Sequence, residues 1–82
     1  MRISEAFAKM VKKLMEEKKW SVADLVRETG MSRSGLVNIL KAEYNQPSLK
    51  TAYKISQAFG VEYGRFLTQI REEFNKGNGH CE

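Results

Sequence analysis

The chain has 82 residues, a length that favours one small domain with a modest core and marginal stability. Its single cysteine, Cys81, excludes an internal disulfide, and no apolar run is long enough to cross a bilayer. We therefore expect a cytoplasmic protein with no membrane partner. The formal net charge of +4 is compatible with a polyanionic partner but does not identify one.

The first half of the chain is expected to form three helices. Apolar residues recur at helical spacing over residues 4–18. Ser21 is the expected N-cap of a short second helix, which Gly30 ends by adopting the left-handed conformation. Ser32 then caps a third helix over residues 33–41.

The second half is expected to add two helices. After a polar loop over residues 42–47, Ser48 caps a fourth helix that ends near Gly60. The expected apolar face of this helix consists of Leu49, Ala52, Ile55 and Phe59. A fifth helix begins near Glu62, and residues 77–82 are expected to be a disordered tail after a domain spanning residues 1–76. Since no strand pattern occurs, the predicted fold class is all-α with five helices.

The helix over residues 33–41 has two contrasting faces. At 100° per residue, Leu36, Ile39 and Leu40 cluster on one side, which is expected to be buried. The opposite side is polar, and such a face is most often simply solvated. The same side chains also suit the edges of bases in the major groove. The candidate base-reading residues are Ser34 and Asn38 on this polar side, Val37 at its flank, and Arg33, which can reach around from the first turn.

The turn between the second and third helices favours the nucleic-acid interpretation. Two short, capped helices joined by Thr-Gly-Met are typical of a helix-turn-helix. Over about residues 5–70 the chain resembles the phage repressor and Cro family, also called the xenobiotic-response-element class. The matching residues are 21–26 (SVADLV), 30–34 (GMSRS), Leu36, Ile39, 45–49 (NQPSL), 54–55 (KI) and 59–61 (FGV). The resemblance implies a compact repressor-like domain whose third helix lies in the major groove of double-stranded DNA.

A second group of residues is expected to bind phosphates. The free N–H groups after Ser32 form an anion-binding helix terminus. The family typically has Gln after the cap of the second helix, where this chain has Val22, which cannot bind a phosphate. Neighbouring polar residues are expected to compensate. The candidate phosphate-binding residues are Lys19, Ser21, Ser32, Lys41 and Asn45.

Two further departures from the family concern packing. Gly35 lies inside the third helix, where glycine costs about 1 kcal/mol relative to alanine. Its role is either close approach to a phosphate or a fit to a crowded site. Met15 and Leu40 replace an Arg–Glu pair that is common in the family, and we expect these two apolar side chains to touch.

The fifth helix carries three large apolar residues at spacing four, namely Phe66, Ile70 and Phe74. One interpretation assigns Phe66 and the adjacent Leu67 to the core of the domain. The other places Phe66, Ile70 and Phe74 in a dimer interface, with Phe74 as an exposed anchor. The resemblance implies dimerisation at this end, so a homodimer on a palindromic operator is expected.

No catalytic site is expected. His80 and Cys81 are adjacent in the tail, and the Glu72–Glu73 pair lies in a mixed-charge stretch that indicates a solvated surface. No cofactor or metal is therefore predicted, and so small a domain leaves little room for an effector pocket. The predicted function is a sequence-specific transcriptional regulator of the repressor type. The alternative is an antitoxin or accessory module that binds another protein.

Overall fold

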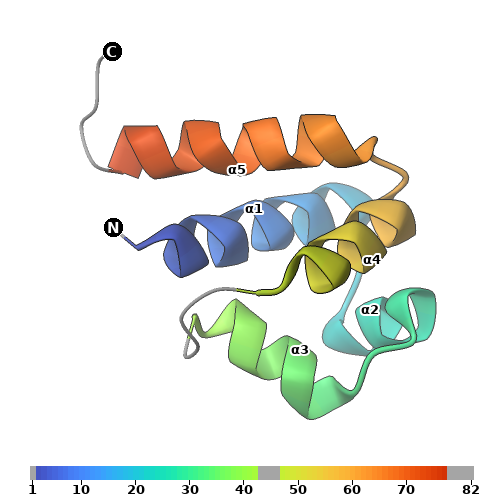
Figure 1. The fold of residues 1–82 in the computed structure, drawn as a ribbon. Coiled ribbons are helices and arrows are strands. Elements are labelled where there is room, and N and C mark those ends of the chain that lie inside the picture. The colour runs from blue at the N-terminus through green and yellow to red at the C-terminus, as the bar shows by residue number, and fades with distance from the viewer. Residues whose placement is uncertain (1, 43–46, 78–82) are drawn as a thin grey trace.

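Every regular element in the described part of the chain is a helix. The structure, a computed structural model, describes residues 2–42 and 47–77. The helices are α1 (Ile3–Lys18), α2 (Val22–Thr29), α3 (Arg33–Leu40), α4 (Leu49–Phe59) and α5 (Tyr63–Gly77). The predicted all-α class is confirmed. In Figure 1, α1 runs between α5 on one side and α3 on the other, and it packs against both.

The predicted helix boundaries follow from local hydrogen bonds. The hydroxyls of Ser21, Ser32 and Ser48 each accept a bond from the backbone N–H three residues later, at 3.3, 3.1 and 3.1 Å. Gly30 and Gly60 end α2 and α4 with φ of 73° and 72°, in the left-handed region that favours glycine. These three starts and two ends were all predicted.

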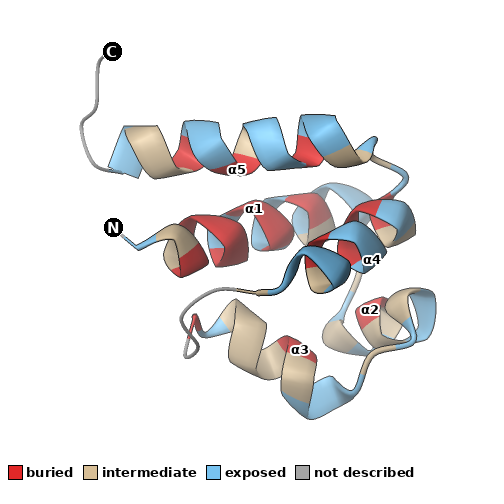
Figure 2. Cartoon of the chain, in the orientation of Figure 1, coloured by how far each residue is buried: buried red, intermediate tan, exposed pale blue. Residues whose placement is uncertain are grey.

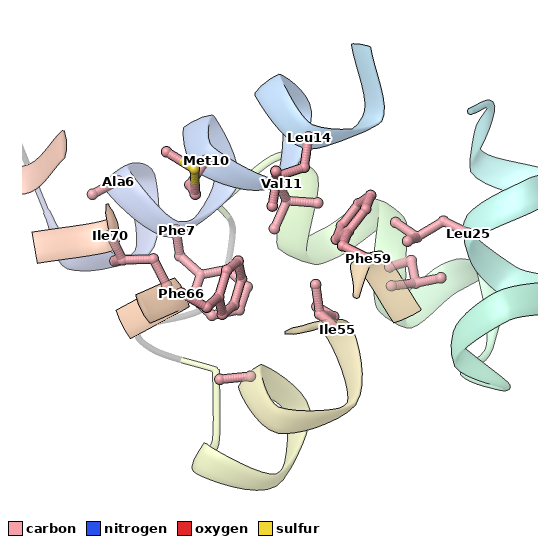
Figure 3. Close-up of a cluster of buried hydrophobic side chains, with 12 residues drawn as sticks. Ala6, Phe7, Met10, Val11, Leu14, Leu25, Ile55, Phe59, Phe66 and Ile70 are labelled. Atoms are coloured by element: carbon pink, nitrogen blue, oxygen red, sulfur yellow. The ribbon is translucent and has the colours of Figure 1, made fainter. Parts of the chain in front are cut away.

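The core forms where α1 meets the other helices, and α1 contributes more to it than the others. Figure 3 shows Phe7 and Phe66 packed together, with ring centroids 5.7 Å apart in an edge-to-face arrangement. Trp20 stacks its ring on that of Phe59 of α4, with ring centroids 5.0 Å apart. The fully buried large side chains include Val11, Leu25, Leu36, Ile55 and Phe66.

Phe66 and Ile70 of α5, both considered for a dimer interface, belong to the core of the chain. Phe66 and Ile70 are buried, and Phe74 is half-buried against the same core. The reason is that α5 packs along α1, so residues at spacing four on α5 all face α1; the buried stripe is visible in Figure 2. Phe66 is therefore enclosed within the chain, whereas Phe74 keeps part of its side chain exposed.

Two leucines predicted to be buried are exposed instead. Leu49 was assigned to the apolar face of α4 but is 73% exposed, and Leu67 was assigned to the core but is 37% exposed. Leu49 is the first residue of α4, and Leu67 lies beside the buried stripe of α5 rather than on it. Together with Tyr53 these leucines leave apolar side chains on the surface of α4 and α5.

Glu73 was predicted to be solvated, and this prediction is wrong. Its side chain is only 5% exposed and forms an ion pair with Lys13 of α1. Lys76 lies 3.7 Å from the same carboxylate oxygen. The hydrogen bond from Lys13 holds the pKa of Glu73 below its ordinary value, against the opposing effect of burial. Glu73 is thus a buried charge that links α5 to α1.

Candidate nucleic-acid interface

The turn between α2 and α3 is held by a threonine hydroxyl. Thr29 donates a hydrogen bond from Oγ1 to the carbonyl of Leu25 at 2.7 Å. The same oxygen accepts a bond from the N–H of Met31 at 3.2 Å. Gly30 donates its N–H to the carbonyl of Val26 at 2.8 Å. These bonds fix the conformation of the turn that joins α2 to α3. The role of Thr29 in this turn was not predicted.

The inner face of α3 is buried largely as predicted. Leu36 is fully buried, whereas Ile39 and Leu40 are half-buried and pack against the core. Leu40 and Met15 line one open groove between α3 and α1. Met15 and Leu40, which replace the charge pair common in the family, therefore lie on facing helices and line the same groove.

The four candidate base-reading residues differ in exposure. Arg33 and Ser34, in the first turn of α3, are exposed, while Val37 and Asn38 are half-buried. Asn38 also lines a pocket between α3 and the start of α4. The first turn of α3 is therefore the most open part of this surface, and Arg33 is its longest side chain.

Ser21 is more constrained than expected of a phosphate ligand. Its N–H donates to Oδ2 of Asp24 at 2.9 Å, and its hydroxyl also bonds this carboxylate, at 3.2 Å. The bond from the Ser21 N–H and a bond from Arg27 lower the pKa of Asp24. Asp24 is therefore ionised at neutral pH, so a negative charge lies where Ser21 was expected to meet a phosphate.

Lys41 shares an open groove with lysines that sequence reasoning missed. The charged side chains that line this groove, between α1 and the end of α3, are Lys9, Lys12, Lys41 and Glu5. The signal in the sequence was the placement of residues 9 and 12 one helical turn apart, on the side of α1 opposite its apolar face. Lys19 and Ser32 are also exposed, and Asn45 lies outside the described residues.

The end of α3 is tied to the start of α1. The guanidinium of Arg2 donates a hydrogen bond to the carbonyl of Ala42 at 3.0 Å. Ala42, which lies just after the helix, has φ of 57°, in the left-handed region. The bond holds the C-terminal end of α3 beside α1, and neither residue was singled out in the sequence.

Gly35 makes room for the cap of its own helix. A Cβ atom at this position would lie 3.0 Å from Oγ of Ser32, closer than ordinary van der Waals contact. Of the two roles considered for Gly35, local crowding is thus supported by the structure. The glycine lets the Ser32 hydroxyl accept the Gly35 N–H at 3.1 Å.

Residues 2–42 and 47–77 contain neither a candidate metal site nor a candidate membrane-spanning helix. No group of three His, Cys, Asp or Glu side chains in these ranges has an arrangement suited to a metal ion. No helix there is both long and apolar enough to span a membrane.

Comparison with known proteins agrees with this geometry. The profile of the helix-turn-helix family matches residues 11–66, well over half of the chain and including all of α2, α3 and α4. The chain belongs to the helix-turn-helix family. The resemblance to repressor and Cro proteins is thereby confirmed.

A curated relative also matches part of the chain. It is an uncharacterised HTH-type transcriptional regulator from Methanocaldococcus jannaschii, 46% identical over 39 residues. The matched segment is 48% of this chain and 58% of that protein, so it spans less than two thirds of the relative's length. No solved structure matches the chain.

Proposed function

We propose that this chain is a sequence-specific DNA-binding transcriptional regulator of the repressor type, with α3 in the major groove. The observation that carries the proposal is the exposed first turn of α3, with Arg33 and Ser34, held by the bonded turn at Thr29. Membership of the helix-turn-helix family and the relative named as a transcriptional regulator support it.

Sequence choice is assigned to four side chains of α3. The guanidinium of Arg33 matches the paired acceptors of guanine, and the amide of Asn38 matches adenine. The Ser34 hydroxyl bonds either donors or acceptors, and the Val37 methyls suit the thymine methyl. Because Arg33 is exposed and Asn38 is half-buried, we assign the larger share of base recognition to Arg33.

Affinity is assigned mainly to phosphate contacts. Lys41 with Lys9 and Lys12 lines a groove at the end of α3, and further phosphate contacts are assigned to the exposed Lys19 and Ser32. Neutralising phosphates releases counterions, so binding should weaken steeply as salt is added. Ser21 contributes less than its sequence position suggested, since its hydroxyl is bonded to Asp24.

We further propose that two copies bind a palindromic operator, with the two α3 helices about 34–36 Å apart. Since Phe66 and Ile70 lie in the core, the contact must use other residues. The large apolar side chains left exposed on α4 and α5 are Leu49, Tyr53 and Leu67. Leu49 and Leu67 line the same small groove between the two helices.

The test is selection of bound duplexes from a random pool, followed by measurement of the stoichiometry. Enrichment of a palindromic site bound by two chains is the expected result. If no duplex is enriched, the proposal fails and the alternative of a protein-binding module is favoured. An enriched site without symmetry, bound by one chain, would contradict the dimer alone.

Replacing Arg33 by alanine is expected to weaken binding to the selected duplex by about 1–3 kcal/mol and to relax preference at one base position. The reason is the loss of a bidentate contact to a base edge. Titration at fixed salt measures the effect. Arg65→Ala is the matched control, because it removes the same charge from an exposed site on α5. Equal losses in the two variants would rule out base reading by Arg33.

Replacing Lys41 by alanine is expected to weaken binding to selected and random duplexes by the same factor. A phosphate contact carries no base information, and its loss should reduce the slope of log affinity against log salt by about 1. Titrations at several salt concentrations measure this slope. A loss confined to the selected duplex would instead place Lys41 at a base.

A further inference from the structure

A pocket of about 270 Å³ lies beside α3, on the side away from the lysine groove. In Figure 1 the start of α1, the last turn of α3 and the start of α4 come together in this region. Its lining includes Ser4, Met31, Asn38, Ile39, Pro47 and Thr51. A dry apolar cavity of about 150 Å³ is large enough to hold benzene. The pocket therefore has room for a small ring with a substituent, contrary to the expectation of little space for an effector.

One polar atom of this lining has no partner in the described structure. Ser4 is 3% exposed, and its hydroxyl oxygen makes no hydrogen bond. A buried hydroxyl without a partner is costly, and such groups are few in native proteins. By contrast Ser56, which is also buried, donates its hydroxyl to the carbonyl of Tyr53 at 2.8 Å. Ser4 is thus a lining residue of the pocket whose buried hydroxyl has no hydrogen-bond partner.

Water fits this pocket poorly. An ordered internal water usually makes two to four hydrogen bonds. The Thr51 hydroxyl already accepts a bond from Ser48 at 3.1 Å. The side chains of Met31, Ile39 and Pro47 supply apolar walls. A mainly apolar molecule with a single polar group matches these walls and the Ser4 hydroxyl better than a cluster of waters does.

We propose that this pocket binds small, mainly apolar molecules that carry one hydrogen-bonding group, which pairs with the Ser4 hydroxyl. Met31 precedes α3, and Asn38 and Ile39 belong to it, so a bound molecule contacts the helix assigned to base recognition. Occupancy lowers DNA affinity, because Asn38 then packs against the ligand and is held away from the base. This second part rests on the proposed function.

The binding test uses phenol and toluene as probes, without DNA. Titration of isotope-labelled protein with phenol should shift the amide resonances of residues 4, 31, 38, 39 and 51. Toluene should bind roughly fivefold more weakly, since it cannot bond to Ser4. In Ser4→Ala the two probes should bind equally, and Thr68→Ala, an exposed hydroxyl change on α5, should keep the preference.

Three results would overturn the pocket: no shifts at these residues, shifts confined to another region, or a preference for phenol that survives in Ser4→Ala. A second variant, Ile39→Phe, fills the pocket from its wall and should abolish binding of both probes. Circular dichroism checks that each variant is folded. Retained binding in a folded Ile39→Phe variant would also contradict the proposed location.

The regulatory part is tested with the selected duplex. Phenol should weaken DNA binding by the wild type, and Ser4→Ala should need roughly fivefold more phenol for the same effect. If phenol occupies the pocket and DNA affinity stays constant, the link to α3 is wrong. If no duplex is selected at all, the proposed function fails, while the titration without DNA still decides whether the pocket binds ligands.

Discussion

Replacing Phe66 by alanine is expected to lower the free energy of unfolding by about 3–5 kcal/mol. Phe66 is fully buried, and its ring meets that of Phe7 at 5.7 Å. Small domains are stable by only about 5–15 kcal/mol, so the variant should be partly or wholly unfolded near room temperature. Urea denaturation followed by circular dichroism measures the loss.

The adjacent residue provides the control. Leu67→Ala removes an apolar side chain that is 37% exposed, so it should cost less than about 1 kcal/mol. The loss in Phe66→Ala should also be independent of protein concentration, because it arises inside one chain. If the loss grows on dilution, or if both variants lose equal stability, Phe66 must instead lie in a dimer interface.

Replacing Glu73 by glutamine is expected to lower the free energy of unfolding by about 1–2 kcal/mol at neutral pH. Glutamine keeps the shape of the side chain but removes the charge that pairs with Lys13. The expected loss of unfolding free energy is small because the Lys13 side chain is 45% exposed, so that solvent screens the ion pair. Thermal or urea unfolding at several pH values measures the effect.

The pH dependence of this pair has a definite sign. The pKa of Glu73 is lower in the folded protein than its ordinary value of 4.5. Its stabilising contribution is therefore complete above pH 4.5 and is lost as the pH falls through the folded-state pKa. The gap between wild type and Glu73→Gln should close in that acidic range. Glu72→Gln, at the exposed neighbouring carboxylate, should show neither the loss nor the pH dependence.

The sequence predicted the helix boundaries well because their causes are local. An N-cap such as Ser48 bonds to an N–H only three residues away, and Gly60 ends its helix through its own backbone conformation. The exposure of Ser34 was likewise predictable, since helical periodicity places it on the side of α3 away from the buried Leu36. Arg33 is exposed because it lies in the first turn of α3. The helix-turn-helix assignment rested on these local features.

Parts of the candidate site were not predictable in this way. The bond between Ser21 and Asp24 is local, yet only its geometry shows that the hydroxyl is turned to the carboxylate. Lys9 and Lys12 join Lys41 because α1 packs against α3, a contact between distant segments. The pocket at Ser4 needs three segments, from α1, α3 and the start of α4, to come together.

By itself, then, the sequence determined the five helices, the N-caps at Ser21, Ser32 and Ser48, the left-handed turn at Gly30 and the polar outer face of α3. Each of these depends on neighbours within a few residues. Only the tertiary structure decided which apolar residues of α5 are core and which are surface. The packing of α5 along α1 buries Phe66 and Ile70, leaves Leu67 exposed and encloses Glu73 beside Lys13. That choice depends on how α5 is rotated about its axis against α1, and Lys13 and Glu73, which pair across these helices, are 60 residues apart. Local periodicity cannot specify such a rotation.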